Sequence, residues 1–228
     1  MRFLSKSDIR PLFEGKSVAI VGSGPGILGN RPGLVDSHDV VVRVNNYKIV
    51  DGRTGHRCDV YYSFFGKSIT KTPRELLADG VKVCMAKCPN AHAIESGWHR
   101  IQGKMNGVDF RWIYQEREGW WPCDVYIPSE IDFLATFHML GRRVPTTGFA
   151  AIVDILEFKP AELFLTGFDG FRSGIHNLDE RWKARNSKDP IGHVPERELE
   201  IMAGMVVRNG IKTDAALAGV LKTVKVAA

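Results

Sequence analysis

The sequence predicts an α/β fold: a single Rossmann-like domain with a mostly parallel, twisted sheet and helices on both faces. Short runs rich in valine and isoleucine alternate along the chain with amphipathic stretches, as strands alternate with crossover helices. A glycine-rich turn follows the first of these runs. The 228 residues, 44% of them hydrophobic, can bury one full core, so residues 1–228 are expected to form one domain.

Six short segments rich in β-branched and aromatic residues have the length of buried strands. Because longer stretches separate them, parallel pairing is expected. In chain order, the predicted strands are residues 17–22, 39–44, 58–64, 81–85, 110–114 and 163–166.

The amphipathic stretches between the strands predict helices. The last helix opens with Pro195, and three glutamates near its start complement the positive end of its dipole. The predicted helices are residues 73–78, 91–101, 129–142, 148–158 and 195–208. The polar stretch 167–192 is too long for a simple connection, so we expect an active-site loop or lid there.

Charge and hydropathy limit the class of protein. The formal charge of +5 suits an anionic partner such as a nucleotide or an acidic membrane face, but so small an excess does not indicate nucleic acid. No apolar run approaches the roughly 20 residues that cross a bilayer, and residues 1–14 lack the order of a signal peptide. We therefore expect a cytoplasmic protein, with peripheral association at the inner membrane face as an open alternative.

The four cysteines, Cys58, Cys84, Cys88 and Cys123, show no framework spacing, so reduced and buried thiols are expected. Cys84, Cys88 and His92 are spaced at intervals of four, which zinc could use on a helix. Structural zinc sites more often use a Cys-x-x-Cys pair. The sequence therefore predicts no metal site.

Candidate binding residues follow the strands, because ligands of parallel sheets bind at the carboxyl ends of the strands. Residues 22–26, Gly-Ser-Gly-Pro-Gly, follow the first strand, and their glycines let backbone amides approach a phosphate or sugar closely. The second strand ends at Asn45, whose amide can hydrogen-bond a ribose or a base edge.

A nicotinamide-dinucleotide fold is the competing interpretation of the glycine-rich turn. Its fingerprint requires a helix directly after the glycines and an acidic residue about 20 residues later. Here residues 30–33, Asn-Arg-Pro-Gly, interrupt a long helix, and the second strand ends in asparagine. An NAD(P)-dependent oxidoreductase therefore stays only as an alternative.

A second anion site is predicted at residues 145–148, Pro-Thr-Thr-Gly, ahead of the apolar helix 148–158. Hydroxyls and unpaired amides at a helix N-terminus bind anions without a basic side chain. Thr146 or Thr147 could equally cap the helix, because capping uses the same amides. This segment alone leaves both interpretations open.

Two histidines lie in polar stretches beyond predicted strands, where an imidazole can exchange protons near neutral pH. They are His176 and His193, 17 residues apart. His193 precedes the helix at Pro195, and the positive end of that helix keeps the ring neutral, as a general base must be. A single loop histidine is more often solvated or structural, but with two anion sites the pair indicates an enzyme that deprotonates an acceptor.

These segments resemble the sialylmotifs of glycosyltransferase family 29, the sialyltransferases. Residues 21–24, Val-Gly-Ser-Gly, stand where the large motif has Val-Gly-Asn-Ser, and residues 36–45 are close to its Asp-Ser-His-Asp-Phe-Val-Leu-Arg-Met-Asn. Residues 145–168 look like the small motif, which begins Pro-Ser/Thr-Thr-Gly and ends in a strand followed by Tyr-Gly-Phe. The resemblance covers about half of the chain.

The last two motifs of the family are also matched. His176 with Asp179 or Glu180 is similar to the third motif, and His193 with Glu198 matches the His-x-x-x-x-Glu of the last. The order of the four motifs agrees with the family, which makes them together far more specific than any one. The chain looks like a soluble member of the bacterial or viral type.

The resemblance implies a GT-A-like sialyltransferase variant of the Rossmann-like fold. The implied reaction is an inverting transfer of sialic acid or the related Kdo from a CMP-activated donor to a hydroxyl of a glycan or lipid-linked glycan. Neither a metal ion nor another cofactor is implied, and no Asp-x-Asp cation clamp occurs in the chain. A single leaving phosphate can be stabilised by backbone amides and one imidazole.

The resemblance also assigns roles to residues. His193 is expected to be the base toward the acceptor hydroxyl, and His176 the partner of the departing phosphate. The CMP pocket and its phosphate site are expected to be lined by Ser23, Gly24, Asn45, Thr146, Thr147, Gly148, Gly167 and Phe168.

Two departures from the family matter. The large motif usually begins with a cysteine that bridges to the small motif, whereas this chain has Ser17 there and no cysteine after Cys123. Ser23 replaces an asparagine that would contact the nucleotide sugar, so the identity of the donor sugar stays open. A catalytically inactive nucleotide- or glycan-binding module remains a further alternative, which would bind CMP without transfer.

Overall fold

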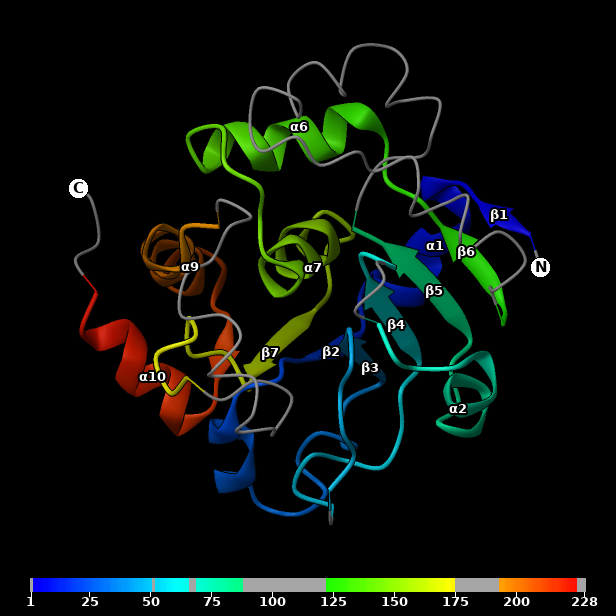
Figure 1. The fold of residues 1–228 in the computed structure, drawn as a ribbon, viewed down its shortest axis with the longest axis horizontal. Helices are drawn as coiled ribbons and strands as arrows, with labels where there is room; N and C mark the ends of the chain where they lie inside the picture. Colours follow the sequence, from blue (N-terminus) through cyan, green and yellow to red (C-terminus); the bar gives the residue numbers. More distant parts are fainter. Residues whose placement is uncertain (1, 51, 66–68, 88–121, 175–192, 225–228) are drawn as a thin grey trace.

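The computed structural model describes residues 2–50, 52–65, 69–87, 122–174 and 193–224 (Figure 1). Within these residues, eight strands form one sheet in the order β1-β6-β5-β4-β3-β2-β7-β8. Every strand pair in it is parallel. The predicted α/β class with a parallel sheet is therefore confirmed.

The central strands agree with the sequence-based predictions to within about two residues, because each is a continuous apolar run buried on both faces. The strand predicted to begin at residue 81 begins two residues later. The predicted strand 110–114 and the predicted helix 91–101 lie outside the described residues. The observed strands are β2 (Ser17–Val21), β3 (Val40–Val44), β4 (Val60–Ser63), β5 (Val83–Ala86) and β7 (Glu162–Thr166).

Three short strands at or next to the edges of the sheet were not predicted. They are β1 (Phe3–Leu4), β6 (Asp124–Tyr126) and β8 (Lys212–Thr213), each of two or three residues. β1 pairs with β6 at the far edge of the sheet, and the chain then returns through α1 (Lys6–Phe13) to begin β2. The N-terminal residues therefore complete the edge that the strand β6 alone would leave open.

The four predicted helices that fall within the described residues occur, with ends shifted by at most three residues. Side-chain caps mark their starts: Thr72 and Glu75 form a capping box on α2, and Ser129 caps α6. Two further helices, α1 and α10 (Ala215–Lys222), were not predicted. The others are α2 (Pro73–Ala78), α6 (Glu130–Met139), α7 (Thr147–Leu156) and α9 (Pro195–Asn209).

Helices cover both faces of the sheet, as predicted. Val18 and Ile20 of β2 pack in a cluster with residues of α1, α7, α9 and α10. Ala19 and Val21 point to the opposite face, where Ile27 of the short 3-10 helix η1 (Pro25–Gly29) covers them. Over β4, β5 and β6, apolar side chains of α2 and α6 belong to a separate cluster. Among the described helices, we find none with the length and apolar character that would cross a membrane.

The strand order places a topological switch beside β2. β3 to β6 extend from one side of β2, whereas β7 and β8 extend from the other. In open parallel sheets the crevice at such a point, beyond the carboxyl ends of the strands, is where ligands bind. A ligand-binding site is therefore expected at the residues that follow β2 and β7.

One buried carboxyl makes the stability of the fold depend on pH. Asp154 of α7 is 9% exposed, and the hydroxyl of Tyr62 on β4 donates to its Oδ2 at 2.6 Å. Burial raises the pKa of the Asp154 carboxyl to about 7. The unfolded chain releases this proton near pH 4, whereas the folded protein keeps it until near pH 7.

We therefore expect the free energy of unfolding to fall between about pH 4 and pH 7, by on the order of a few kcal/mol. Asp154→Asn, which carries no charge at any pH, should remove this part of the slope. Urea denaturation between pH 4 and pH 8 measures it, and Glu196→Gln on the exposed start of α9 is the matched control. Equal slopes for the Asp154→Asn variant and the control would contradict the expectation.

Candidate active site

The backbones just beyond the carboxyl ends of the paired strands β2 and β7 stay in direct contact. The amide of Gly24 donates to the carbonyl of Gly167, and that of Gly22 donates to Thr166, both at 2.8 Å. A Cβ on Gly22 would lie 2.3 Å from the Gly167 oxygen, and Gly167 has a φ of +73°. The glycine-rich turn is thus needed for strand packing, besides any role with a ligand.

A buried polar network stabilises this contact between the ends of β2 and β7. The hydroxyl of Thr166 accepts from Asn30 Nδ2 at 2.9 Å and donates to Asp214 Oδ2 at 2.6 Å. The same carboxylate oxygen accepts from the Gly167 amide at 3.1 Å, and Oδ1 caps α10 by accepting from the Leu217 amide. Asp214 therefore fixes the end of β7 and the start of α10 together.

The predicted Pro-Thr-Thr-Gly segment begins α7, with Thr146 as its cap. The Thr146 hydroxyl accepts from the Phe149 amide at 3.2 Å. Glu198 of α9, 5% exposed, accepts from the Thr146 amide at 2.6 Å and from its hydroxyl at 2.5 Å. Capping therefore uses only the Phe149 amide, and no partner among the described residues is found for the Thr147 and Gly148 amides.

His193 lies beside this segment. Its Nδ1 is 2.7 Å from the carbonyl oxygen of Val144. Because a carbonyl can only accept, Nδ1 carries a proton, and a neutral ring then has its lone pair on Nε2. The Val144 carbonyl, two positions before Thr146, thus fixes the tautomer of the predicted base, His193.

Phe168 joins the two predicted binding segments. A Cβ on Gly148 would lie 2.5 Å from its ring, and a Cβ on Gly22 would lie 3.3 Å from it. The ring consequently packs over both the glycine-rich turn and the start of α7. One end of the sheet, beyond the carboxyl ends of its strands, therefore carries Gly24, Gly167, Phe168, Gly148, Thr146 and His193.

Asn45 follows β3 at the same end of the sheet. Its φ of 49° is in the left-handed region, which asparagine tolerates better than most residues. Its Oδ1 accepts from the Ser63 hydroxyl at 3.2 Å. Ser63 ends β4 and was not predicted as a site residue, although it lies next to the last residue of the predicted strand 58–64.

Lys87 is another residue that the sequence did not single out. It follows β5, is 5% exposed, and donates through Nζ to the Pro145 carbonyl at 3.1 Å. Its Nζ also lies 5.8 Å from the centroid of the Phe64 ring. The buried ammonium therefore connects the outer strands to the segment that starts α7, and its position directly after a strand was the available signal.

Ser23, Thr147 and His176 are the remaining predicted residues. Ser23 is half-buried between its two glycines, and Thr147 is buried in the first turn of α7. His176, with the rest of residues 175–192, lies outside the described residues, so its role toward a phosphate stays a prediction. The same holds for the predicted lid beyond residue 174.

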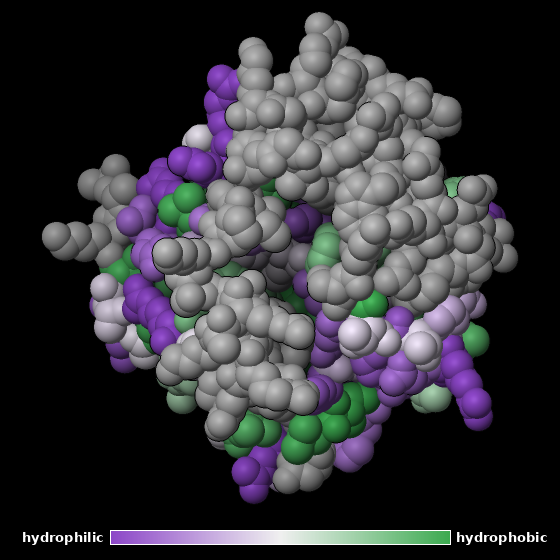
Figure 2. Space-filling view, viewed as in Figure 1, coloured by the Kyte–Doolittle hydropathy of each residue, from purple (hydrophilic) through white to green (hydrophobic). Residues whose placement is uncertain are grey.

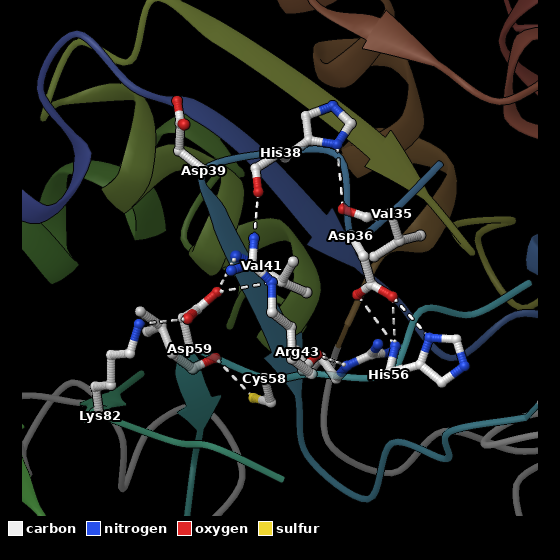
Figure 3. A network of polar contacts seen from close by, with 12 residues as sticks. Val35, Asp36, His38, Asp39, Val41, Arg43, His56, Cys58, Asp59 and Lys82 are labelled. Atoms are coloured by element: carbon white, nitrogen blue, oxygen red, sulfur yellow. Dashed lines mark hydrogen bonds and ion pairs between the residues drawn. The ribbon is translucent and has the colours of Figure 1, made fainter. Parts of the chain in front are cut away.

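Two polar side chains in the segment similar to the large motif support the sheet. Arg43 is fully buried and donates to the carbonyls of Arg57 at 2.8 Å and Thr54 at 2.5 Å. Asp36 accepts from the amide and the ring of His56 (Figure 3). These contacts hold the chain between β3 and β4, so the likeness in this segment is partly structural.

Figure 2 shows a hollow near the centre of the view, in line with α7 in Figure 1.

A dinucleotide site and a metal site were the other kinds of site that the sequence raised. The helix after the glycine-rich turn is η1, of five residues, and not the long helix of a dinucleotide fingerprint. Among the described residues no three His, Cys, Asp or Glu side chains gather as metal ligands would; Cys88 and His92 lie outside them.

The close contact between Gly22 and the Gly167 carbonyl leads to a testable prediction. Gly22→Ala places a methyl group against a backbone oxygen that cannot move cheaply, so we expect a loss of roughly 1–3 kcal/mol in the free energy of unfolding. Gly29→Ala is the matched control, because a Cβ there meets nothing within 4 Å. Urea denaturation of both variants measures the effect. Similar denaturation midpoints would show that the close contact between Gly22 and Gly167 does not constrain the fold.

The fold is similar to that of solved sialyltransferases. A mammalian sialyltransferase in complex with Gal-beta-1-3GalNAc-ortho-nitrophenol matches 90% of this chain and 71% of its own, with 16% identity and a TM-score of 0.56. A mammalian sialyltransferase structure matches 87% and 68%, with 15% identity and a TM-score of 0.57.

The sialyltransferase CstII from Campylobacter jejuni, in complex with the substrate analogue CMP-3FNeuAc, matches 87% of this chain and 80% of its own. The identity is 16% and the TM-score 0.54. Comparison with protein-family models and with the sequences of curated proteins gave no match. At these identities the likeness concerns the fold, and the chain has a sialyltransferase-like fold.

Proposed function

We propose that the protein is a glycosyltransferase of the sialyltransferase type. In this proposal it transfers sialic acid or Kdo from a CMP-activated donor to a hydroxyl of a glycan or lipid-linked glycan, with inversion and without a metal ion. The observation that carries the proposal concerns His193 and the start of α7. The Val144 carbonyl fixes the tautomer of His193, and the nearby Thr147 and Gly148 amides have no partner among the described residues. The fold adds support, because CstII, solved with a CMP-sugar analogue, shares it.

His193 supplies the basic atom. With Nδ1–H donated to the Val144 carbonyl, Nε2 is the nitrogen that takes the proton of the acceptor hydroxyl. The hydroxyl oxygen then forms a bond to the anomeric carbon as the bond from that carbon to the phosphate oxygen breaks. The ring becomes an imidazolium whose Nδ1–H still donates to the Val144 carbonyl, so the orientation of the ring is kept through the step.

The start of α7 supplies hydrogen-bond donors for the departing phosphate. The amides of Thr147 and Gly148 point along the positive end of the helix dipole and have no partner among the described residues. Glu198 already engages the amide and hydroxyl of Thr146, so those two groups act on the helix start and not on the ligand. In the proposal His176 stays the second partner of the phosphate.

The predicted CMP contacts are Ser23, Gly24 and Asn45. They follow β2 and β3 at the carboxyl ends of these strands, where the chain presents backbone amides and one carboxamide. The acceptor is expected beside His193, because the base must reach its hydroxyl.

The proposal predicts that His193→Ala loses transfer by a factor of about 10²–10⁴ while CMP still binds, because the base acts on the acceptor. The measurements are the thermal midpoint with CMP, CMP-sialic acid, CMP-Kdo, UDP or NADP under a chelator, and transfer to a glycan panel. A ligand that binds the native state raises the midpoint in proportion to occupancy. His138→Ala, on the exposed face of α6, is the matched control.

Three outcomes would contradict the proposal in different ways. A rise with NADP alone would favour the oxidoreductase. A rise with CMP but no transfer by the wild-type protein, whatever the acceptor, would favour the inactive binding module. Full transfer by the His193→Ala variant would remove the base while leaving the donor class intact.

A further inference from the structure

Two cysteines that the proposed reaction does not use lie in contact at one end of the sheet. Cys84 is on β5, and Cys123 directly precedes β6, the neighbouring strand. Their Sγ atoms are 3.5 Å apart, although the residues are 39 positions apart in the chain. The other cysteine of the described residues, Cys58, is buried, and its thiol donates to the Val60 carbonyl at 3.3 Å.

The strand register explains why the two sulfurs meet. Cys84 is opposite Val125, so Cys123 lies two residues before that partner, on the same face of β6. Cys84 and Val125 belong to one apolar cluster, against which Cys123 packs. A disulfide needs a sulfur separation of about 2.05 Å, so the sulfurs must approach by about 1.5 Å, which is within the reach of side-chain rotation.

The two thiols differ in environment. Cys84 is fully buried, whereas Cys123 is half-buried. The Cys84 thiol as hydrogen-bond donor lowers the pKa of Cys123, and the same contact together with burial raises the pKa of Cys84. Cys123 is therefore the sulfur that reaches solvent and ionises first, as the attacking thiol of an exchange reaction must.

We propose that Cys84 and Cys123 form a redox modification site, a dithiol that a small-molecule disulfide converts to an intramolecular disulfide. The Cys123 thiolate attacks one sulfur of the small disulfide and releases the first small thiol, which takes up the proton that Cys123 lost. Cys84 then attacks the Cys123 sulfur, and the second small thiol leaves with the Cys84 proton. Two protein thiols are oxidised, and one small disulfide is reduced to two thiols.

The bridge would join β5 to β6 through a closed loop of about 40 residues. Closing a loop of this length restricts the unfolded chain, so the oxidised protein should unfold at a temperature several degrees higher than the reduced one. β5 ends next to Lys87, which contacts the segment before α7. The site therefore lies on a strand that also reaches the candidate active site, although the inference rests on the sulfur geometry alone.

The test uses the full-length protein with oxidised glutathione, followed by alkylation and a peptide map without reductant. We expect one cross-linked peptide pair that contains Cys84 and Cys123, its loss on reduction, and the rise in thermal midpoint. The wild-type map decides the proposal without any variant. A bridge from Cys123 to Cys88, or two thiols that still alkylate fully after treatment and unfolding, would overturn it.

Variants test the order of the two steps. Cys84→Ser removes the resolving thiol, so glutathione should stay attached to Cys123 as a mixed disulfide. Cys123→Ser leaves only the buried thiol and should take up little glutathione. Cys58→Ala is the matched control and should form the same bridge as the wild type. Equal glutathione uptake by the two serine variants would contradict the assignment of Cys123 as the attacking thiol.

Discussion

The fold depends on one constraint, the close approach of the backbones at the ends of β2 and β7. These strands are neighbours, and their chains touch where they leave the sheet, through the amide of Gly24 and the carbonyl of Gly167. Glycine at position 22 is required because a Cβ would overlap the Gly167 carbonyl. The same contact sets the position of the Phe168 ring, and through it the start of α7 at Gly148. A packing requirement thus shapes the site before any ligand is considered.

Two buried carboxylates extend this constraint to the C-terminal third of the chain. Asp214 accepts from Thr166 and Gly167 while capping α10, and Glu198 accepts from Thr146, the cap of α7. Each carboxylate satisfies amides that a helix start or strand end leaves unpaired, so neither is an uncompensated buried charge. The last helices therefore position the site as well as cover the sheet.

The sequence predicted the features that have a local signal. The central strands are long apolar runs, and the turn after β2, the start of α7 and His193 stand directly at the ends of elements. The strands β1, β6 and β8 have only two or three residues, too few to show a periodic pattern. α1 contains Pro11, and a proline in a sequence predicts the end of a helix. Contacts across the chain were also missed: Asn30 meets Thr166 over 136 positions, and the partner of the His193 ring is a backbone carbonyl that any residue could provide.

The position of Glu198 bears on the kind of donor that the site can take. Its carboxylate lies within hydrogen-bond distance of the first donors of α7, so it offsets part of the positive end of that helix. A ligand anion must share the remaining field with this fixed negative charge, and every further charge on the ligand adds repulsion that a partly buried site screens poorly. A diphosphate would usually recruit a cation to offset this repulsion, whereas a single phosphate can be held by the Thr147 and Gly148 amides. Within the proposed function, the position of Glu198 is thus an argument for a nucleoside monophosphate donor that does not depend on the likeness in fold.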